Sequence, residues 1–172
     1  MDVAFHVREF LSSADMGVRM NGHGQGNPLK DMLDMGMLGK KSGAGFYVYD
    51  KPGGKKKGVN PEVTKRASEF VVEDLKLGAD EIVNRLLSRF VNEAVLCLQE
   101  GIIERPEDGD IGAVFGCGFL PYTGGPFRML DQRGIAQYTD MMHGFADKYG
   151  EQFVPCQLMQ DMAKSGAKFY TK

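Results

Sequence analysis

An internal repeat constrains this chain more than any other feature of its sequence. The segment KSGAGFY at residues 41–47 recurs as KSGAKFY at residues 164–170, with six identities in seven positions at an offset of 123 residues. Upstream, NPLKDMLDM at 27–35 aligns with VPCQLMQDM at 154–162 once a length difference of four residues is allowed. Such self-similarity indicates a duplicated unit. One copy extends over about 80–172 and only the back half of another precedes it, so we expect a piece of a longer chain.

The second copy opens with the strongest periodic segment of the sequence. Residues 80–101 read DEIVNRLLSRFVNEAVLCLQEG, in which apolar side chains recur every three or four positions. This spacing predicts an amphipathic helix with one buried stripe. Asp80 is the expected N-cap, and Gly101 is the expected residue just beyond the C-terminus. A helix of this length spans roughly 30 Å, and we expect it to be the central element of the copy.

The other periodic segments also predict helices, and none resembles a buried parallel strand. The start signals include prolines that follow Asn or Gly, and most of the stop signals are glycines. The expected helices are 2–13, 28 to about 38, 61 to about 72, a short helix within 105–119, 126–133, 135–149 and 155–166. The predicted fold class is therefore all-α, with two duplicated helical domains of which the first is truncated.

A change of composition marks a boundary between the copies. Residues 51–61, KPGGKKKGVNP, combine two prolines, three glycines and four lysines with one apolar residue, which is typical of a solvated linker. The preceding GFYVYD is compatible with an extended segment or an irregular tail. We therefore assign 1–50 to the back half of the first copy, 51–79 to a linker with a connecting helix, and 80–172 to the second copy.

Charge and composition exclude several classes of protein. A formal charge of -2 and a pI near 5.9 argue against a nucleic-acid-binding protein, which ordinarily carries a basic excess. No apolar run approaches the roughly 18 residues that cross a bilayer. The three cysteines form no CxxC pair, so we expect neither a disulfide framework nor a metal site. The first ten residues carry no targeting pattern.

The order of motifs in the second copy resembles a known family. VNRLLSRFVNEAVLCLQEG is followed by PEDGDIGAVFGCGF, GGPFRMLDQRG, a closing helix and KSGAKFY. This order is similar to that of the C-terminal helical domain of 3-hydroxyacyl-CoA dehydrogenases. GGPFR together with the duplication resembles the alpha subunits of fatty-acid β-oxidation trifunctional complexes. The resemblance covers nearly the whole chain outside the linker.

The resemblance implies a multifunctional enzyme as the parent protein, with enoyl-CoA hydratase and NAD-dependent long-chain 3-hydroxyacyl-CoA dehydrogenase activities. In that family the catalytic His and Glu and the NAD site belong to a Rossmann domain, and no matching segment occurs here. We therefore expect no catalytic residue and no cofactor in this chain. Its implied role is to close one side of the acyl-CoA cleft and to support assembly.

The partners implied by the resemblance are the NAD-binding and hydratase domains of the same chain, a thiolase beta subunit and the acyl-CoA substrate. The implied location is mitochondrial, in the matrix or at the inner membrane, and a homodimer is also expected. The alternative is a purely structural helical interaction module without acyl-CoA contact. A related sugar- or hydroxyacid-dehydrogenase family is disfavoured by GGPFR and by the duplication.

Two residues are candidates for contact with substrate or with a neighbouring domain. Asn84 matches the polar Asn that the family places at the start of the long helix beside the substrate, where an amide orients an oxygen without titrating. Because Asn84 lies in the second copy, the other interpretation is a polar residue at the rim of a helix interface. Arg128 lies near a helix start, where a cation is unfavourable. We expect Arg128 to pack in an interface and to pair with a carboxylate, such as Asp131 or one of a partner domain.

The remaining residues with chemical potential are expected to be structural. His6, His23 and His143 have no carboxylate partner in a recognisable motif. The segments GHGQG and GAG follow no predicted strand of a βαβ unit, so they indicate turns rather than a dinucleotide site. The lysines at 55–57 are typical of a solvated linker rather than of a CoA-phosphate or membrane contact.

Overall fold

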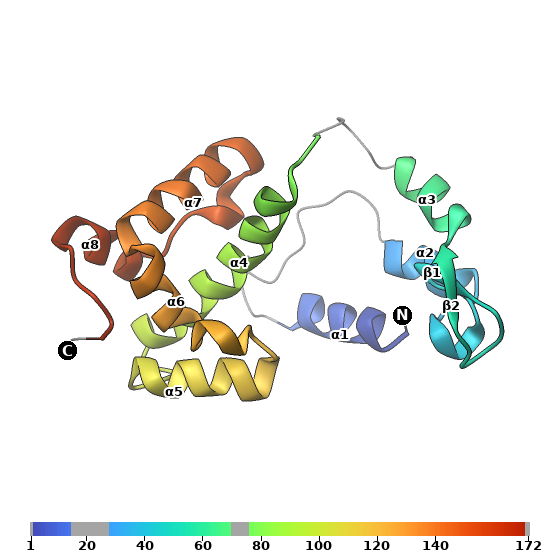
Figure 1. Ribbon diagram of the computed structural model, residues 1–172, viewed down its shortest axis with the longest axis horizontal. Coiled ribbons are helices and arrows are strands. Elements are labelled where there is room, and N and C mark those ends of the chain that lie inside the picture. Colours follow the sequence, from blue (N-terminus) through green and yellow to red (C-terminus); the bar gives the residue numbers. More distant parts are fainter. Residues whose placement is uncertain (1, 15–27, 70–75, 171–172) are drawn as a thin grey trace. The chain divides into compact units, whose positions relative to one another are not determined.

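A computed structural model describes residues 2–14, 28–69 and 76–170, and the chain divides into two compact units, Met1–Leu75 and Lys76–Lys172. The first unit contains three helices and a β-hairpin among its described residues (Figure 1). Its elements are α1 (Asp2–Ser13), α2 (Pro28–Asp34), a 3-10 turn (Lys40–Ser42), β1 (Tyr47–Tyr49), β2 (Lys56–Val59) and α3 (Pro61–Ser68). The predicted bounds of α1 are confirmed. Helix α2 ends earlier than predicted, and Gly36 follows it in the left-handed region with φ 68°.

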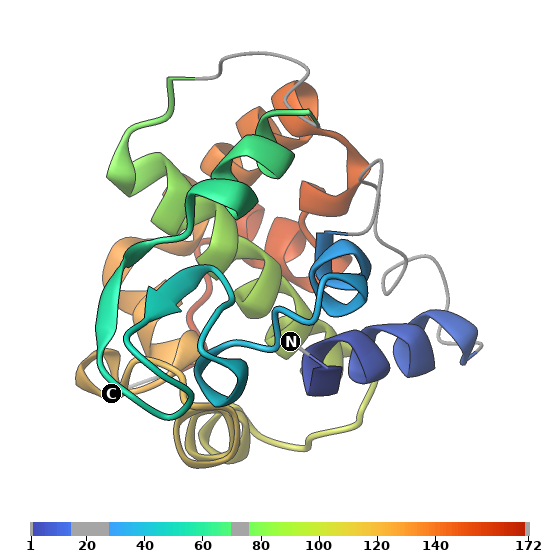
Figure 2. The ribbon, with the colours of Figure 1, turned by 90° about the vertical axis from the view of Figure 1, so that its right-hand side faces the viewer.

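The hairpin lies partly where the sequence predicts a solvated linker. Strand β1 pairs antiparallel with β2, and Figure 2 shows this part of the ribbon. Tyr47 lies opposite Val59, and Tyr49 lies opposite Lys56. The turn is closed by the Asp50 carboxylate, which accepts the Lys55 backbone N–H at 2.8 Å. All four residues of β2 are exposed, so its composition does not distinguish it from a linker. The linker prediction is therefore wrong for this strand.

Asn60 connects the hairpin to α3. Its side chain is 5% exposed, and its Nδ2 donates to the Gly45 carbonyl at 2.9 Å. Its Oδ1 accepts the Glu62 backbone N–H at 3.1 Å, which is the usual role of an Asn N-cap before a first-turn proline. One buried amide thus serves both the repeat segment and the next helix.

The second unit is helical throughout its regular elements (Figure 1). Its helices are α4 (Ala79–Gln99), α5 (Pro106–Ile111), a π-helical continuation (Gly112–Gly116), α6 (Pro126–Arg133), α7 (Ile135–Tyr149) and α8 (Gln157–Ser165), with 3-10 turns at Pro121–Thr123 and Glu151–Phe153. The predicted bounds of α6 and α7 are confirmed. The N-cap of α4 is Gly78 rather than the predicted Asp80. Asp80 lies in the first turn, where its negative charge interacts favourably with the positive end of the helix dipole.

The core of the second unit forms where α4 meets the later helices. Six apolar side chains that are each 0% exposed come from four helices: Val91 and Val95 of α4, Phe127 and Leu130 of α6, Met142 of α7 and Met159 of α8. Full burial of such side chains contributes about 1.5–3 kcal/mol each. The all-α fold class is confirmed, with the small hairpin of the first unit as an addition. No helix among the described residues has the length and apolar character needed to cross a membrane.

Candidate functional site

The GGPFR segment takes part in a polar cluster of the second unit. Its two glycines supply no capping side chain, so the first backbone N–H groups of α6 need an acceptor from elsewhere. The Asp110 carboxylate, at the end of α5, is that acceptor. It accepts the Phe127 N–H at 2.8 Å and the Arg128 N–H at 3.3 Å. Asp110 is only 4% exposed, and the positive end of α6 compensates its buried charge.

Glycine is required on both sides of this contact. A Cβ at Gly125, whose φ is +115°, would lie 2.3 Å from Asp110 Oδ1. A Cβ at Gly109 would lie 2.4 Å from the Phe127 ring. Both distances are far below van der Waals contact, so α5 and α6 approach this closely only because neither glycine has a side chain.

Tyr170, in the second repeat segment, completes the cluster. Its hydroxyl donates to Asp110 Oδ2 at 2.6 Å. Burial, together with this hydrogen bond to an anion, raises the pKa of the Tyr170 phenol well above its ordinary value. The Arg128 guanidinium carbon lies 4.0 Å from the centre of the Tyr170 ring, a cation-π arrangement. The expected ion pair between Arg128 and Asp131 is not among the contacts of the described residues.

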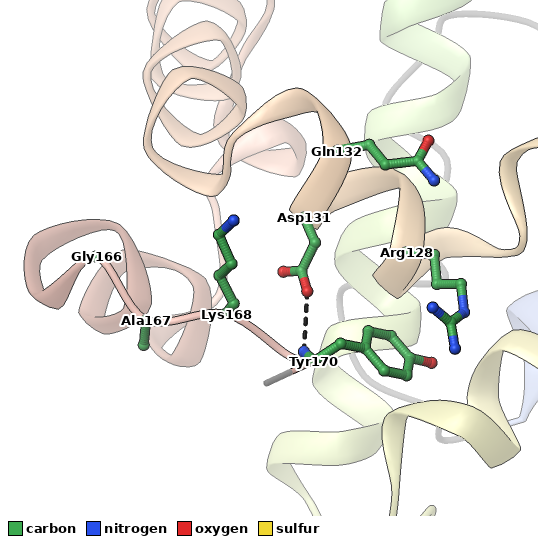
Figure 3. Close-up of a pocket in the computed structure, with 7 residues that line it drawn as sticks. All are labelled: Arg128, Asp131, Gln132, Gly166, Ala167, Lys168 and Tyr170. Atoms are coloured by element: carbon green, nitrogen blue, oxygen red, sulfur yellow. Dashed lines mark hydrogen bonds between the residues drawn. The ribbon is translucent and has the colours of Figure 1, made fainter. Parts of the chain in front are cut away.

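Asp131 instead holds the backbone of the repeat segment (Figure 3). Its two oxygens accept the N–H groups of Phe169 at 3.0 Å and of Tyr170 at 2.9 Å. The Phe169 ring packs edge-on against Phe127, with centroids 4.9 Å apart. Residues 166–170, called the tail below, are therefore fastened to α6 through both backbone and side chains.

Two of the cavities in the second unit are lined by residues of these elements and of α4. The first, of about 610 Å³, lies between α6 and the tail, and Arg128 is one of its lining residues. The second, of about 350 Å³, is strongly apolar and lies between α4 and α5. Its lining includes Phe90, Ala94, Cys97, Ile103 and Cys117. Sequence reasoning anticipated neither cavity, because both arise from side chains far apart in the chain.

Asn84 does not line the cavity that Arg128 lines. The half-buried Asn84 side chain accepts a hydrogen bond from Arg133 Nη1 at 3.0 Å, which joins α4 to the end of α6. Its backbone carbonyl accepts the Ser88 hydroxyl. The amide oxygen is thus already used within the unit.

The histidines in the described part of the chain show no catalytic arrangement. His6 is exposed on α1 with its ring 5.7 Å from that of Phe5, and His143 is exposed on α7. No hydrogen bond joins either one to a carboxylate, and no cluster of three metal-ligating side chains occurs among the described residues. His23 and the GHGQG segment lie outside the described residues. Lys56, from the lysine run, lies 4.4 Å from the centre of the Tyr47 ring.

Sequence reasoning missed Asp110 and gave Asp131 the wrong partner. A signal for Asp110 was present, because a helix that begins Gly-Gly-Pro lacks its own N-cap side chain and needs an external acceptor. Which acidic residue supplies that acceptor depends on tertiary packing across 15 or more residues. No local pattern encodes it.

Comparison with known proteins places these features in a family context. Residues 82–170 match the family described as 3-hydroxyacyl-CoA dehydrogenase, C-terminal domain. The chain is 43% identical over 157 residues to the fatty acid oxidation complex subunit alpha of Vibrio vulnificus, covering 91% of this chain and 21% of that protein. It is 47% identical over 132 residues to the subunit of the same name from Vibrio cholerae, covering 77% of this chain and 18% of that protein.

The subunit of the same name from Shewanella amazonensis is 44% identical over 132 residues, again covering 77% of this chain and 18% of that protein. The chain thus spans about a fifth of the length of the curated relatives that it matches. All three relatives are bacterial, and bacteria have no mitochondria. The predicted mitochondrial location is therefore wrong, and with it the expected association with a mitochondrial inner membrane.

Proposed function

Because this chain belongs to the family of 3-hydroxyacyl-CoA dehydrogenase C-terminal domains, we propose that it works as part of the alpha subunit of a fatty acid oxidation complex. The observation that carries this proposal is the 43% identity over 91% of the chain to a subunit of that name. The whole protein would hydrate enoyl-CoA and oxidise long-chain 3-hydroxyacyl-CoA with NAD. With a thiolase beta subunit, it would form a trifunctional complex.

The described residues do not fit an NAD site. A dinucleotide site needs a parallel strand, a glycine-rich turn and a helix N-terminus in succession. The described sheet is a single antiparallel hairpin, and the GAG segment at 43–45 lies in the turns before its first strand. We therefore assign NAD to a different part of the parent protein and derive no chemical step through it here.

The role proposed for this chain is a helical wall of the acyl-CoA cleft and an assembly surface. The match over 82–170 supports residues 80–172 as one helical domain, and the repeat at 41–47 supports 1–50 as the back half of another, joined through 51–79. Exposed apolar side chains on α4, such as Leu86 at 70%, support a covering partner. The candidates are the NAD-binding and hydratase domains, the beta subunit and a second copy of this chain.

Asn84 and Arg128 enter this proposal as contact residues and not as catalytic groups. A contact of either with acyl-CoA or with a neighbouring domain is part of the proposal. A specific observation favours the alternative for Asn84, a purely structural module without acyl-CoA contact. Its amide oxygen is engaged by Arg133, so a substrate would have to displace that guanidinium.

Calorimetric titration of the purified chain with a long-chain 3-hydroxyacyl-CoA, and separately with NAD, tests the proposal. Saturable heat with the thioester and none with NAD is the expected result. No heat with either ligand would favour the structural module and remove the acyl-CoA contact. Saturable NAD binding would overturn the assignment of the cofactor to another part of the protein. Sedimentation of the same sample reports whether a second copy covers α4.

A further inference from the structure

The cavity beside the tail has the size and the lining of a small-molecule site. Its volume of about 610 Å³ lies within the range of roughly 300–1,000 Å³ usual for such sites. Helix α6 contributes Arg128, Asp131 and Gln132 to its wall. The tail contributes residues 166–168 and Tyr170 (Figure 3). Polar side chains of two elements therefore meet around one cavity.

The cationic groups of this wall have no ion-pair partner among the described residues. Arg128 interacts with the Tyr170 ring through its guanidinium, and no carboxylate within residues 2–14, 28–69 and 76–170 forms an ion pair with it. The exposed Lys168 ammonium and the Gln132 amide likewise make no hydrogen bond to the described protein. Donors of this kind, left unpaired at a cavity, suit an anionic ligand.

The position of Arg128 is fixed from two sides. The aromatic ring of Tyr170 lies 4.0 Å from the guanidinium carbon. A Cβ at Gly124 would lie 2.8 Å from Arg128 Cδ, so the aliphatic part of the side chain passes directly against that glycine. A guanidinium held in place loses less rotamer entropy when its planar fork binds an oxyanion.

Carboxylates near the cavity are largely engaged by other donors. Both Asp131 oxygens accept backbone N–H groups of the tail. Asp110 accepts two N–H groups of α6 and the Tyr170 hydroxyl. Glu107 is exposed and its charge reaches the Tyr170 phenol, so this side chain opposes an anion at the site. In Figure 3, Arg128 and Gln132 project on one side of Asp131 and Lys168 on the other, which separates the two cations.

We propose that this cavity binds a ligand with two phosphoryl groups, one at Arg128 and one at Lys168. A guanidinium matches phosphate bidentately and an ammonium acts as a point charge, so the two cations suit two separate phosphates. Resting on the proposed function, the ligand is the phosphorylated adenosine end of an acyl-CoA thioester. Its two phosphate-bearing positions on one ribose fit a cavity of nucleotide size.

Titration of the whole chain with adenosine 3′,5′-bisphosphate tests this proposal, with adenosine as the control ligand without phosphates. Saturable binding of the bisphosphate and none of adenosine is expected. Lys168→Gln should weaken binding about fivefold, because an exposed charge at a phosphate is partly screened. Lys164→Gln is the matched control, since it removes an equal exposed charge outside the cavity and should leave affinity unchanged.

Glu107→Gln gives a test of opposite sign. It removes the opposing charge and should tighten binding of the bisphosphate about twofold, and raising the salt concentration should weaken binding to the wild type. Absence of bisphosphate binding, or equal effects of the Lys168 and Lys164 substitutions, would overturn the site. Arg128→Gln is a poorer first variant, because it also removes the contact with Tyr170.

The outcomes separate this site from the proposed function. Binding of the thioester without binding of the bisphosphate, and without an effect of Lys168→Gln, would refute the site and leave the function standing. Binding of the bisphosphate at Lys168 without any binding of the thioester would establish the site and refute the acyl-CoA contact.

Discussion

The two copies of the repeat begin alike and end differently. In both, the Lys-Ser pair closes a helical turn and the next glycine lies in the left-handed region, Gly43 with φ 82° and Gly166 with φ 70°. After that glycine, the first copy enters strand β1, whereas the second becomes the tail on α6. The shared residues therefore encode a helix terminator, and the fate of the following residues depends on what is available to bind their backbone.

The aromatic pair of each copy shows the same difference. Phe46 and Tyr47 are 44% and 42% exposed in the hairpin, while Phe169 and Tyr170 are half-buried against α6. In the first copy, a buried Asn60 side chain donates to the backbone of the repeat segment. In the second copy, the carboxylate of Asp131 accepts from the corresponding region. A donor in one unit and an acceptor in the other select different backbone geometries.

The single difference within the repeat has a structural cause. A Cβ at Gly45 would lie 2.6 Å from the Cα of Gly39, so a side chain does not fit there. The equivalent Lys168 is exposed at the edge of a cavity. The six identical residues therefore occur in two different backbone conformations, and the differing seventh residue, Gly45 or Lys168, fits the space available in its own copy.

The largest expected effect comes from a substitution in the second copy at the contact between α5 and α6. Gly125→Ala places a Cβ against the Asp110 carboxylate and forces a left-handed φ on a residue with a side chain. Urea unfolding of the second unit should show a loss of about 3 kcal/mol. Gly112→Ala, where a Cβ would meet nothing within 4 Å, is the control and should be close to neutral. A loss below about 1 kcal/mol would contradict the close approach of α5 and α6.

Exchanging the one residue that differs between the repeat segments, Gly45 or Lys168, tests the comparison directly. Gly45→Lys makes the first copy identical to the second and should destabilise the hairpin by about 2 kcal/mol, because the backbone of Gly39 cannot yield freely. The reverse change, Lys168→Gly, should cost less than about 1 kcal/mol, since the residue is exposed. Amide hydrogen exchange in β1 and in the tail measures both. Equal effects in the two directions would refute the stated cause.

Removal of the Asp131 carboxylate should loosen the tail while the residues of the repeat segment stay unchanged. Asp131→Ala leaves the N–H groups of Phe169 and Tyr170 without their carboxylate, at a cost of about 1–2 kcal/mol. Exchange of these two amides should accelerate by about tenfold, while amides in β1 keep their rates. Asp161→Ala on α8 is the exposed control. Unchanged exchange in the tail would show that side-chain packing alone holds it.

The smallest expected effect concerns the phenol of Tyr170 and its pH dependence. Tyr170→Phe removes the hydrogen bond to Asp110 and should cost about 1 kcal/mol at neutral pH. Because the folded pKa of Tyr170 is raised, its contribution is present below the unfolded value of about 10 and is lost as pH rises above it.

Urea unfolding between pH 8 and 11 measures this loss. The wild type should lose stability above about pH 10 more steeply than Tyr170→Phe. Burial also raises the pKa of Tyr138 to about 12, so the variant retains part of the slope. Parallel profiles for the two proteins would contradict the contribution of Tyr170.

Local signals in the sequence predicted much of the helical fold. Pro126 and Gly134 set the bounds of α6, and the periodicity of 135–149 gave α7. The hairpin was missed because the exposed, lysine-rich β2 has no alternating pattern. In the candidate site, Arg128 was named for its unfavourable place at a helix start, but its actual partner, Tyr170, lies 42 residues along the chain. Such partners are set by packing, which the local sequence does not encode.

The way in which the tail is held also has an evolutionary consequence. Asp131 grips main-chain N–H groups, which every residue except proline possesses. Mutations at positions 167 and 168 can therefore change the size and charge of those side chains while the hydrogen bonds between Asp131 and the backbone of the tail remain. Single substitutions at these two positions can therefore change the charge and shape of the cavity edge during evolution, with little loss of folding stability.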